Sequence, residues 1–283
     1  MPDDRAQDLP EGILRVTADN PGPMTFKGTN SYVVGNTEAC VLVDPGPEDS
    51  AQLDALSKAV GSRRVEALLL THRHSDHSGL VDGARRHFDA PLLAAPSPEI
   101  AYQDSVDFAA LHPDRALVDG ETLDLAGQRI DVVATPGHTS DHIAFALPAL
   151  GLLLSGDHVM GWSTTVVIPP DGSMRQYRDS LKKLMERAET VYLPGHGDPI
   201  ERPGRLVRNF LTHRRQREEM ILASLTDAPA TIAQLVERHY PGVEGGLAVA
   251  AGYSVRAHLV ELFERGVLAG PDPLASDGPF RIG

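Results

Sequence analysis

The sequence predicts a mixed α/β fold of two packed β-sheets with helices outside, followed by a small helical unit. Over the first two thirds of the 283 residues, short apolar strands alternate with amphipathic helices. Two strand-rich halves that each carry helices are typical of layered sheets. After residue 204 the pattern changes to helices separated by turns with Pro or Gly. We therefore expect a larger domain over residues 1–204 and a winged-helix-like domain over residues 205–283.

The first half of the larger domain is expected to begin with strands and to continue with alternating helices and strands. Apolar and β-branched runs predict strands at 13–18, 31–36, 40–46 and 65–72. A helix is predicted over 50–61, because its apolar residues have helical spacing between Ser50 as N-cap and Gly61 as a stop. A second helix is predicted over 78–88.

Strands dominate the second half of this domain. They are predicted at 116–137, 142–147, 151–157 and 190–198, with an amphipathic helix over 174–188 before the last of them. Three helices then follow, over 205–225, 231–240 and 254–268, and residues 269–283 form either a small hairpin or irregular structure.

Charge and composition limit the classes of partner. The formal net charge of −13 lies within residues 1–204, because residues 205–283 hold equal numbers of acidic and basic residues. An acidic domain argues against tight binding of duplex DNA, which depends on phosphate neutralisation by Lys and Arg. A winged-helix-like unit with no net charge suits packing or a homodimer better than DNA binding. A DNA-binding sensor remains the non-enzymatic alternative.

The sequence predicts a cytoplasmic protein. No apolar run reaches the roughly 18 residues of a membrane span, so we expect no membrane partner. The acidic, Pro-bearing start differs from a signal peptide. The single cysteine, Cys40, cannot form an internal disulfide.

Residues 68–79, LLLTHRHSDHSG, carry the strongest chemical signal. His72, His74, Asp76 and His77 follow directly after an apolar run. Imidazoles and carboxylates are ligands for a divalent ion such as zinc. Alternate residues at a strand end share one side, while adjacent Asp76 and His77 can point to two neighbouring places. One short segment could therefore supply ligands to two metals.

Three further ligand-type side chains occupy comparable positions. His138, Asp157 and His196 each follow an apolar strand and one or more small residues. If these strand ends lie at one edge of the sheets, they converge with the first segment. The sequence therefore predicts a site for two divalent metals.

These motifs resemble those of the metallo-β-lactamase-fold hydrolases over roughly residues 12–200. They are His72-x-His74-x-Asp76-His77, Gly137-His138-Thr139, Ser155-Gly156-Asp157 and Gly195-His196-Gly197. The resemblance implies an αββα sandwich with the metals at one edge. It further implies a first metal on His72, His74 and His138, a second on Asp76, His77 and His196, and a bridge through Asp157.

The resemblance also implies the chemistry. A hydroxide between the two metals would be the nucleophile, oriented by Asp76. We expect two Zn²⁺ ions, with Mn²⁺ or Fe²⁺ as alternatives because all ligand atoms are nitrogen or oxygen. Asp76 and Asp157 are thus the predicted catalytic residues.

Several longer stretches, among them GTNSYVVG, TPGHTSDHIAF and HRRQREEMIL, are similar to the beta-lactamase-like protein 2 branch of this family. That likeness implies cleavage of single-stranded RNA. Hydrolysis of a small ester, thioester or lactone, as in glyoxalase II-like enzymes, is the alternative, because a hydroxide between two metals attacks either centre. Arg205, Arg208 and Arg215 could share one helix face for RNA, or equally form a solvated face.

Four residues are predicted to contact the substrate: Asn30, Tyr32, Thr164 and Thr165. For Asn30 and Tyr32, which lie at a strand end, a structural role is the alternative. Asp44, Asp141 and His142 are predicted to orient ligating histidines, as metal sites commonly require.

Overall fold

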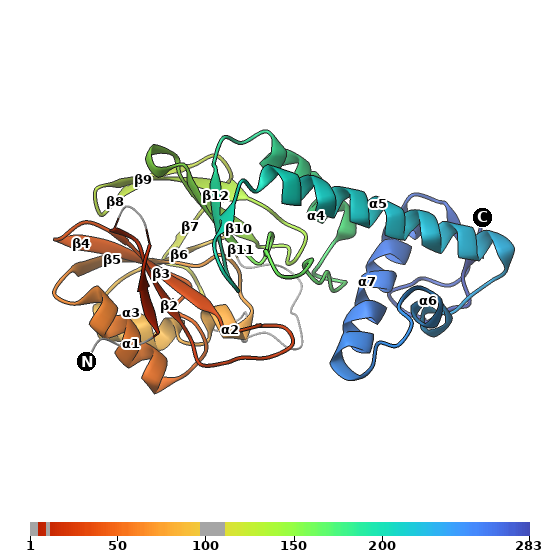
Figure 1. The fold of residues 1–283 in the computed structure, drawn as a ribbon, viewed down its shortest axis with the longest axis horizontal. Helices are drawn as coiled ribbons and strands as arrows, with labels where there is room; N and C mark the ends of the chain where they lie inside the picture. The colour runs from red at the N-terminus through yellow and green to blue at the C-terminus, as the bar shows by residue number, and fades with distance from the viewer. Residues whose placement is uncertain (1–4, 10–11, 97–110) are drawn as a thin grey trace. The chain divides into compact units, whose positions relative to one another are not determined.

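The computed structural model describes residues 5–9, 12–96 and 111–283, and its chain groups into two compact units (Figure 1). Unit 1 comprises residues 1–135, 141–163 and 188–203, and unit 2 comprises residues 136–140, 164–187 and 204–283. Unit 2 therefore includes two segments that precede residue 204. The division into a catalytic and a winged-helix-like domain at that residue stays a prediction.

A seven-stranded sheet forms the first layer of unit 1, with its strands in the order of the chain. Strands β1 to β4 are antiparallel neighbours, whereas β4 to β7 run parallel. The strands are β1 (Ala6–Asp8), β2 (Leu14–Thr17), β3 (Asn30–Gly35), β4 (Ala39–Val43), β5 (Arg64–Leu69), β6 (Leu92–Ala94) and β7 (Arg115–Ala116).

A six-stranded sheet forms the second layer, in the order β13-β12-β11-β10-β9-β8. Its neighbours are antiparallel except for β11 and β12, which are parallel. The strands are β8 (Thr122–Leu125), β9 (Gln128–Ala134), β10 (Ile143–Leu147), β11 (Leu152–Gly156), β12 (Val191–Pro194) and β13 (Ile200–Glu201).

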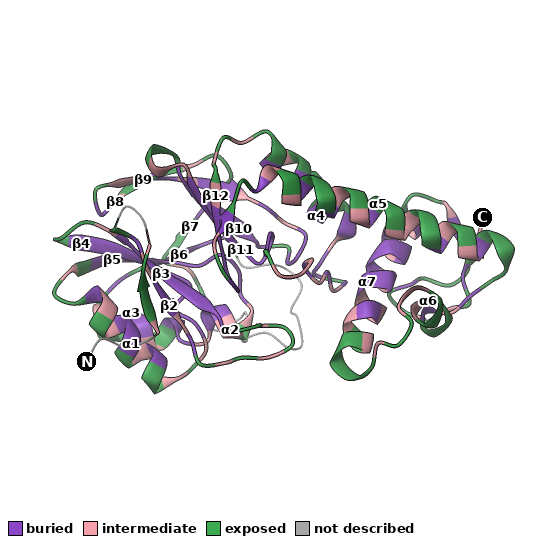
Figure 2. Ribbon diagram, viewed as in Figure 1, coloured by how far each residue is buried: buried purple, intermediate pink, exposed green. Residues whose placement is uncertain are grey.

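Two apolar clusters hold unit 1 together. Side chains such as Val41, Leu69 and Phe145 from both sheets form one core, and the central strands are buried along their length (Figure 2). The opposite face of the first sheet packs against α1 (Ser50–Val60) and α3 (Val81–Phe88). This order of helix layer, sheet and sheet agrees with the mixed α/β fold predicted from the sequence.

The helix ends follow the expected chemistry with one difference. Gly61 ends α1 with φ of +63°, as predicted, because this left-handed conformation suits glycine. The N-cap is Asp49 rather than Ser50, since the Asp49 side chain accepts a hydrogen bond from the Ala51 amide. A carboxylate at this position also interacts well with the positive end of the helix dipole.

Unit 2 is mainly helical. A core that includes Ile221, Leu235, Leu259 and Phe280 joins its last three helices. Residues 269–283, expected as a hairpin or as irregular structure, end in the second strand of a two-stranded antiparallel sheet. The elements are α4 (Met174–Met185), α5 (Gly204–Asp227), α6 (Ile232–His239), α7 (Gly245–Glu264), β14 (Leu268–Ala269) and β15 (Arg281–Ile282). A C-terminal helical region is thus present, and its likeness to a winged helix stays a prediction.

Within the described residues, no helix has the length and apolar character needed to cross a membrane. The cytoplasmic location and the homodimer stay predictions.

Candidate metal centre

The ends of four strands carry the candidate ligands. Residues His72 to His77 follow β5, with Asp76 and His77 in the short helix α2 (Ser75–Ser78). Because β11 and β12 are parallel neighbours, their carboxyl ends lie side by side and bring Asp157 next to the loop of His196. His138 lies in the short turn between β9 and β10, which the hydrogen bond from Thr135 N to His142 O closes at 2.9 Å.

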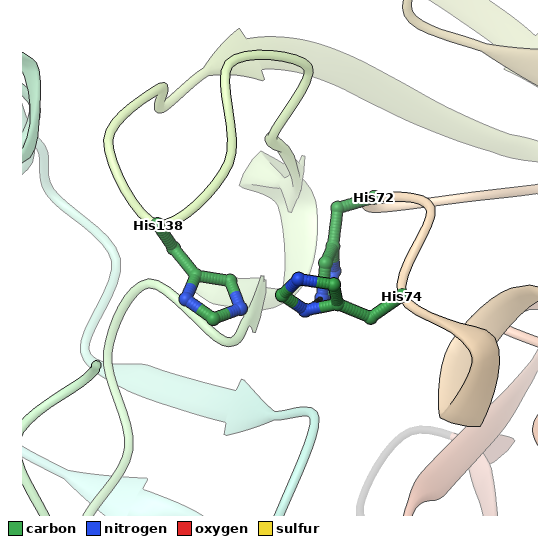
Figure 3. A group of neighbouring side chains, drawn as sticks. All are labelled: His72, His74 and His138. Atoms are coloured by element: carbon green, nitrogen blue, oxygen red, sulfur yellow. Dashed lines mark hydrogen bonds between the residues drawn. The ribbon is translucent and has the colours of Figure 1, made fainter. Parts of the chain in front are cut away.

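The structure brings all seven predicted ligands into three overlapping groups. Within each group, one ligand atom per residue lies within 4.8 Å of the others. Figure 3 shows the imidazole rings of the first group directed at one another from two loops. The groups are His72, His74 and His138; His72, His77 and Asp157; and Asp76, His77 and His196.

The separations between ligand atoms match those around one small cation. Around a tetrahedral zinc ion with bonds of about 2.0–2.1 Å, neighbouring ligand atoms lie about 3.3–3.4 Å apart. His77 Nε2 and His196 Nε2 are 3.4 Å apart, and Asp76 Oδ2 lies 3.4 Å from the first and 3.2 Å from the second. In the other group, His72 Nε2 lies 3.0 Å from His74 Nδ1. These donors therefore fit divalent metal ions.

Four of the histidines have the Nδ1 atom next to an oxygen outside the cluster. An oxygen acceptor at Nδ1 keeps the proton there and leaves the Nε2 lone pair for a metal. The pairs are His72 with Thr71 Oγ1 at 3.0 Å, His77 with Asp44 Oδ2 at 2.9 Å, His138 with Val166 O at 2.7 Å and His196 with Gly28 O at 3.2 Å.

Electrostatics at the cluster favour positive charge. Burial alone would lower the pKa of His77, but the carboxylates of Asp76 and Asp157 raise it well above its usual value. Against the same effect of burial, Asp157 raises the pKa of His196 to about 9. Burial would raise the pKa of each carboxyl, yet the two imidazoles hold both below the usual range. Carboxylates that stabilise these protons would also stabilise a divalent cation in their place.

Gly195 permits the close approach of the strand ends. A Cβ atom on Gly195 would lie 2.4 Å from Asp157 Oδ1 and 2.6 Å from His77 Cε1. Both distances are far below van der Waals contact, so the cluster in this form requires glycine next to His196.

Asp44 has the contacts expected of a residue that orients a ligand. Besides His77, its carboxylate accepts hydrogen bonds from the Thr71 amide and the Thr71 hydroxyl, each at 2.7 Å. Thr71 was not anticipated from the sequence. Because the Thr71 hydroxyl donates its own hydrogen to Asp44, its oxygen can accept a hydrogen bond from His72 Nδ1–H. The Asp44 carboxylate thus supports two histidines.

Asp141 and His142 were also predicted to orient ligating histidines, and that role stays a prediction. His142 Nε2 accepts a hydrogen bond from the Asp157 amide at 3.1 Å, and the His142 ring stacks on the His72 ring with centroids 5.1 Å apart. Asp141 forms a buried ion pair with Arg73 at 3.1 Å. Arg73 also donates to the carbonyls of Ala95 and Pro96. Its role was not foreseen, although it lies between His72 and His74.

Asn30 and Tyr32 were predicted either to contact the substrate or to have a structural role. Both are at most 2% exposed. Asn30 donates to the carbonyls of Pro194 and Gly197, and the Tyr32 hydroxyl donates to Pro194 O at 2.7 Å. These bonds hold the loop that carries His196, as the structural alternative expects, and contact with a substrate stays a prediction.

Thr164 and Thr165 lie in unit 2, where Thr165 is buried and Thr164 half-buried. The Thr165 carbonyl accepts a hydrogen bond from Arg214. Contact between either side chain and a substrate stays a prediction.

The chain is similar to known proteins along most of its length. The chain is 32% identical to the Beta-lactamase-like protein 2 homolog of Drosophila melanogaster, over 92% of this chain and 90% of the fly protein. It is also 32% identical to the Atrochrysone carboxyl ACP thioesterase of Aspergillus fumigatus, over 81% of this chain and 76% of the fungal protein.

A crystal structure of a metallo-beta-lactamase family protein from Thermus thermophilus superposes with a TM-score of 0.77 at 26% identity, covering 97% of this chain and 99% of that one. The family model of the metallo-beta-lactamase superfamily matches residues 24–196, which include all seven candidate ligands. The predicted fold class is thereby confirmed. The chain belongs to the metallo-beta-lactamase superfamily, whose members are metal-dependent hydrolases.

Proposed function

We propose that this chain is a two-metal hydrolase in which Asp157 would hold both metals. The position of the Asp157 carboxylate carries the proposal. Oδ1 lies 3.4 Å from His77 Nε2, and Oδ2 lies 3.2 Å from His196 Nε2. The Asp157 carboxylate also lies in one group with His72, a proposed ligand of the first metal. It is therefore close to donors of both proposed metals.

The remaining ligands divide between the two metals. His72, His74 and His138 would hold the first, and Asp76, His77 and His196 the second. Zn²⁺ is the proposed ion, since imidazole and carboxylate donors at these separations suit its tetrahedral sites. Manganese and iron accept the same donors and are the alternatives.

Such a metal pair supplies acidity to a coordinated water and stabilises negative charge on the oxygen of a substrate under attack. The chain's own contribution is orientation. Asp76 Oδ2 accepts a hydrogen bond from Thr29 Oγ1 at 3.1 Å, which fixes the carboxylate beside His196. From this place Asp76 would accept a hydrogen bond from the attacking water and direct it at the substrate.

We propose a small ester or thioester as the substrate. The fungal relative is named as a thioesterase, and the acidic residues 1–204 do not favour a polyanion. The arginines of α5 add little support for RNA. Arg214 is buried, the Arg217 guanidinium stacks at 4.3 Å from the Tyr240 ring, and the exposed Arg215 pairs with Glu219.

Cleavage of single-stranded RNA is the second candidate. It is supported by the similarity to the fly protein over 92% of this chain, which includes part of the helical region after residue 204. Arg205 and Arg208 of α5 are exposed and could contact phosphates.

A substrate panel separates the two candidates. The protein, loaded with zinc or manganese, is offered acyl thioesters, lactones, a β-lactam and single-stranded RNA. We expect thioester or ester hydrolysis to exceed RNA cleavage. RNA cleavage without ester or thioester hydrolysis would reverse this order, and inactivity on every substrate would contradict the hydrolase.

The bridging role is tested with the Asp157→Ala variant, and the variant Asp124→Ala, at an exposed position, serves as the control. We expect Asp157→Ala to abolish turnover and to lose bound metal while its circular dichroism stays that of the wild type. Full activity in this variant would refute the proposed bridge.

A further inference from the structure

Arg214 of α5 is a buried cation that forms no ion pair within the described part of the chain. Its side chain is almost fully buried, at 2% exposure. Its described contacts are the Thr165 carbonyl, Ser254 Oγ at 3.2 Å and the ring of Tyr177, whose centroid lies 5.3 Å from the guanidinium. Burial of a charge without a carboxylate partner costs stability, so this arrangement calls for an explanation.

Two of these contacts, those with Thr165 and Tyr177, involve segments that lie against the loop of His138. Thr165 precedes Val166, whose carbonyl lies 2.7 Å from His138 Nδ1. Tyr177 packs against the other side of the loop, because a Cβ atom on Gly137 would lie 2.3 Å from the Tyr177 backbone. All of these residues belong to unit 2.

We propose that Arg214 is a positioning residue for His138. By holding the Thr165 carbonyl, the guanidinium fixes the path of residues 165–166, so that the Val166 carbonyl faces His138 Nδ1. That carbonyl then keeps the proton on Nδ1 and directs Nε2 toward His72 and His74. This inference rests on the proposed function, in which His138 is a ligand of the first metal.

Other contacts already join α4 to α5 and α7. Arg178 of α4 forms ion pairs with Glu218 of α5, at 2.6 Å, and with Glu261 of α7. A role for Arg214 in helix packing alone therefore predicts lower stability in its variants but no change at the His138 ring.

The first test examines His138 in the metal-free protein. The imidazole Nδ1–H resonance is recorded by ¹⁵N-edited NMR and assigned by its absence from the His138→Gln variant. We expect the resonance to vanish through fast exchange in Arg214→Met, which lacks a donor. We expect it to persist in Arg214→Gln, which keeps one. Arg215→Met, at a neighbouring exposed position, is the matched control and should keep it.

The second test measures metal retention. Because supporting partners of metal ligands typically change affinity by roughly 10–100-fold, Arg214→Met should bind the first metal at least about tenfold more weakly. The second metal, on Asp76, His77 and His196, should be retained as in the wild type. If Arg214→Met bound both metals with the affinity of the wild type and kept the His138 Nδ1–H resonance unchanged, the proposal would be overturned.

A further variant covers the case in which Arg214→Met does not fold. Ser254→Ala removes only the hydroxyl that accepts a hydrogen bond from the Arg214 guanidinium, and it should broaden the His138 Nδ1–H resonance. An unchanged resonance in Ser254→Ala would then count against the proposal. The NMR test needs neither metal nor substrate, so failure of the hydrolase assignment in the wild type is a separate result.

Discussion

One carboxylate oxygen of Asp44 lies between two residues that support the cluster. Oδ2 accepts hydrogen bonds from Thr71 Oγ1 at 2.7 Å and from His77 Nδ1 at 2.9 Å. Through Thr71 it also reaches His72, whose Nδ1 lies 3.0 Å from the same hydroxyl. The tautomers of two proposed ligands, one for each metal, therefore depend on a single side chain that binds no metal itself.

Replacement of Asp44 by Asn should weaken metal binding with little change in shape. The amide can present N–H groups to His77 Nδ1, which favours the tautomer protonated at Nε2 and removes the lone pair from the metal. We expect metal affinity to fall by roughly 10–100-fold, as measured by competition with a chromogenic chelator. Asp54→Asn, on the exposed face of α1, is the control. Wild-type affinity in Asp44→Asn would show that this contact does not set the tautomer.

Gly195→Ala should prevent assembly of the site. The new methyl group would lie 2.4 Å from Asp157 Oδ1, so either β12 or the carboxylate has to move. We expect the variant to lose turnover and most bound metal, as measured by inductively coupled plasma spectrometry and a hydrolysis assay. Gly252→Ala in α7, where a Cβ atom meets nothing within 4 Å, should behave as the wild type. Normal metal content in Gly195→Ala would contradict the close packing described above.

His258 of α7 should make the stability of the metal-free protein depend on pH. It is 1% exposed, and neither ring nitrogen has a hydrogen-bond partner among the described residues. Burial, followed by Arg214 and Arg178, lowers its pKa well below the usual value, and His213 and Arg217 act in the same direction. Between the folded pKa and the unfolded pKa of about 6.5, the unfolded chain therefore binds more protons.

The free energy of unfolding should accordingly fall as the pH drops below about 6.5. The contribution of His258 is at most about 1.4 kcal/mol per pH unit. Urea unfolding at pH 7.5 and 5.5 would measure this slope, and His258→Leu should reduce it. His87→Leu, at an exposed position, should leave the slope unchanged. An equal slope in His258→Leu and the wild type would show that His258 takes up its proton in the folded protein.

The ligand set could be predicted from the sequence because each member follows a recognisable apolar strand. His72, His138, Asp157 and His196 all occupy strand ends or the loops just beyond them, and the carboxyl ends of parallel neighbours necessarily meet. The rule of parallel neighbours applies to Asp157 and His196, whereas the division of all seven residues between two metals came from the family resemblance and stays a prediction.

The supporting residues were harder to assign because their roles depend on contacts between distant parts of the chain. Asn30 and Tyr32 lie on a strand buried on both faces, so alternation cannot distinguish a cleft residue from a core residue. Arg214 reaches Thr165 across 49 positions of sequence, and no local pattern in α5 marks it apart from neighbouring arginines. Thr71 was equally hard to assign, since its role depends on a hydrogen bond to Asp44, 27 residues away.

Metal content tests the central claim most directly. Metal-free protein is titrated with Zn²⁺, and bound metal per chain is compared between the wild type and Asp157→Ala. We predict close to two ions per wild-type chain, with hydrolysis appearing as the sites fill, and weaker binding of both ions in the variant. A wild-type protein that binds no divalent metal, or that hydrolyses its substrate fully without one, would contradict the account.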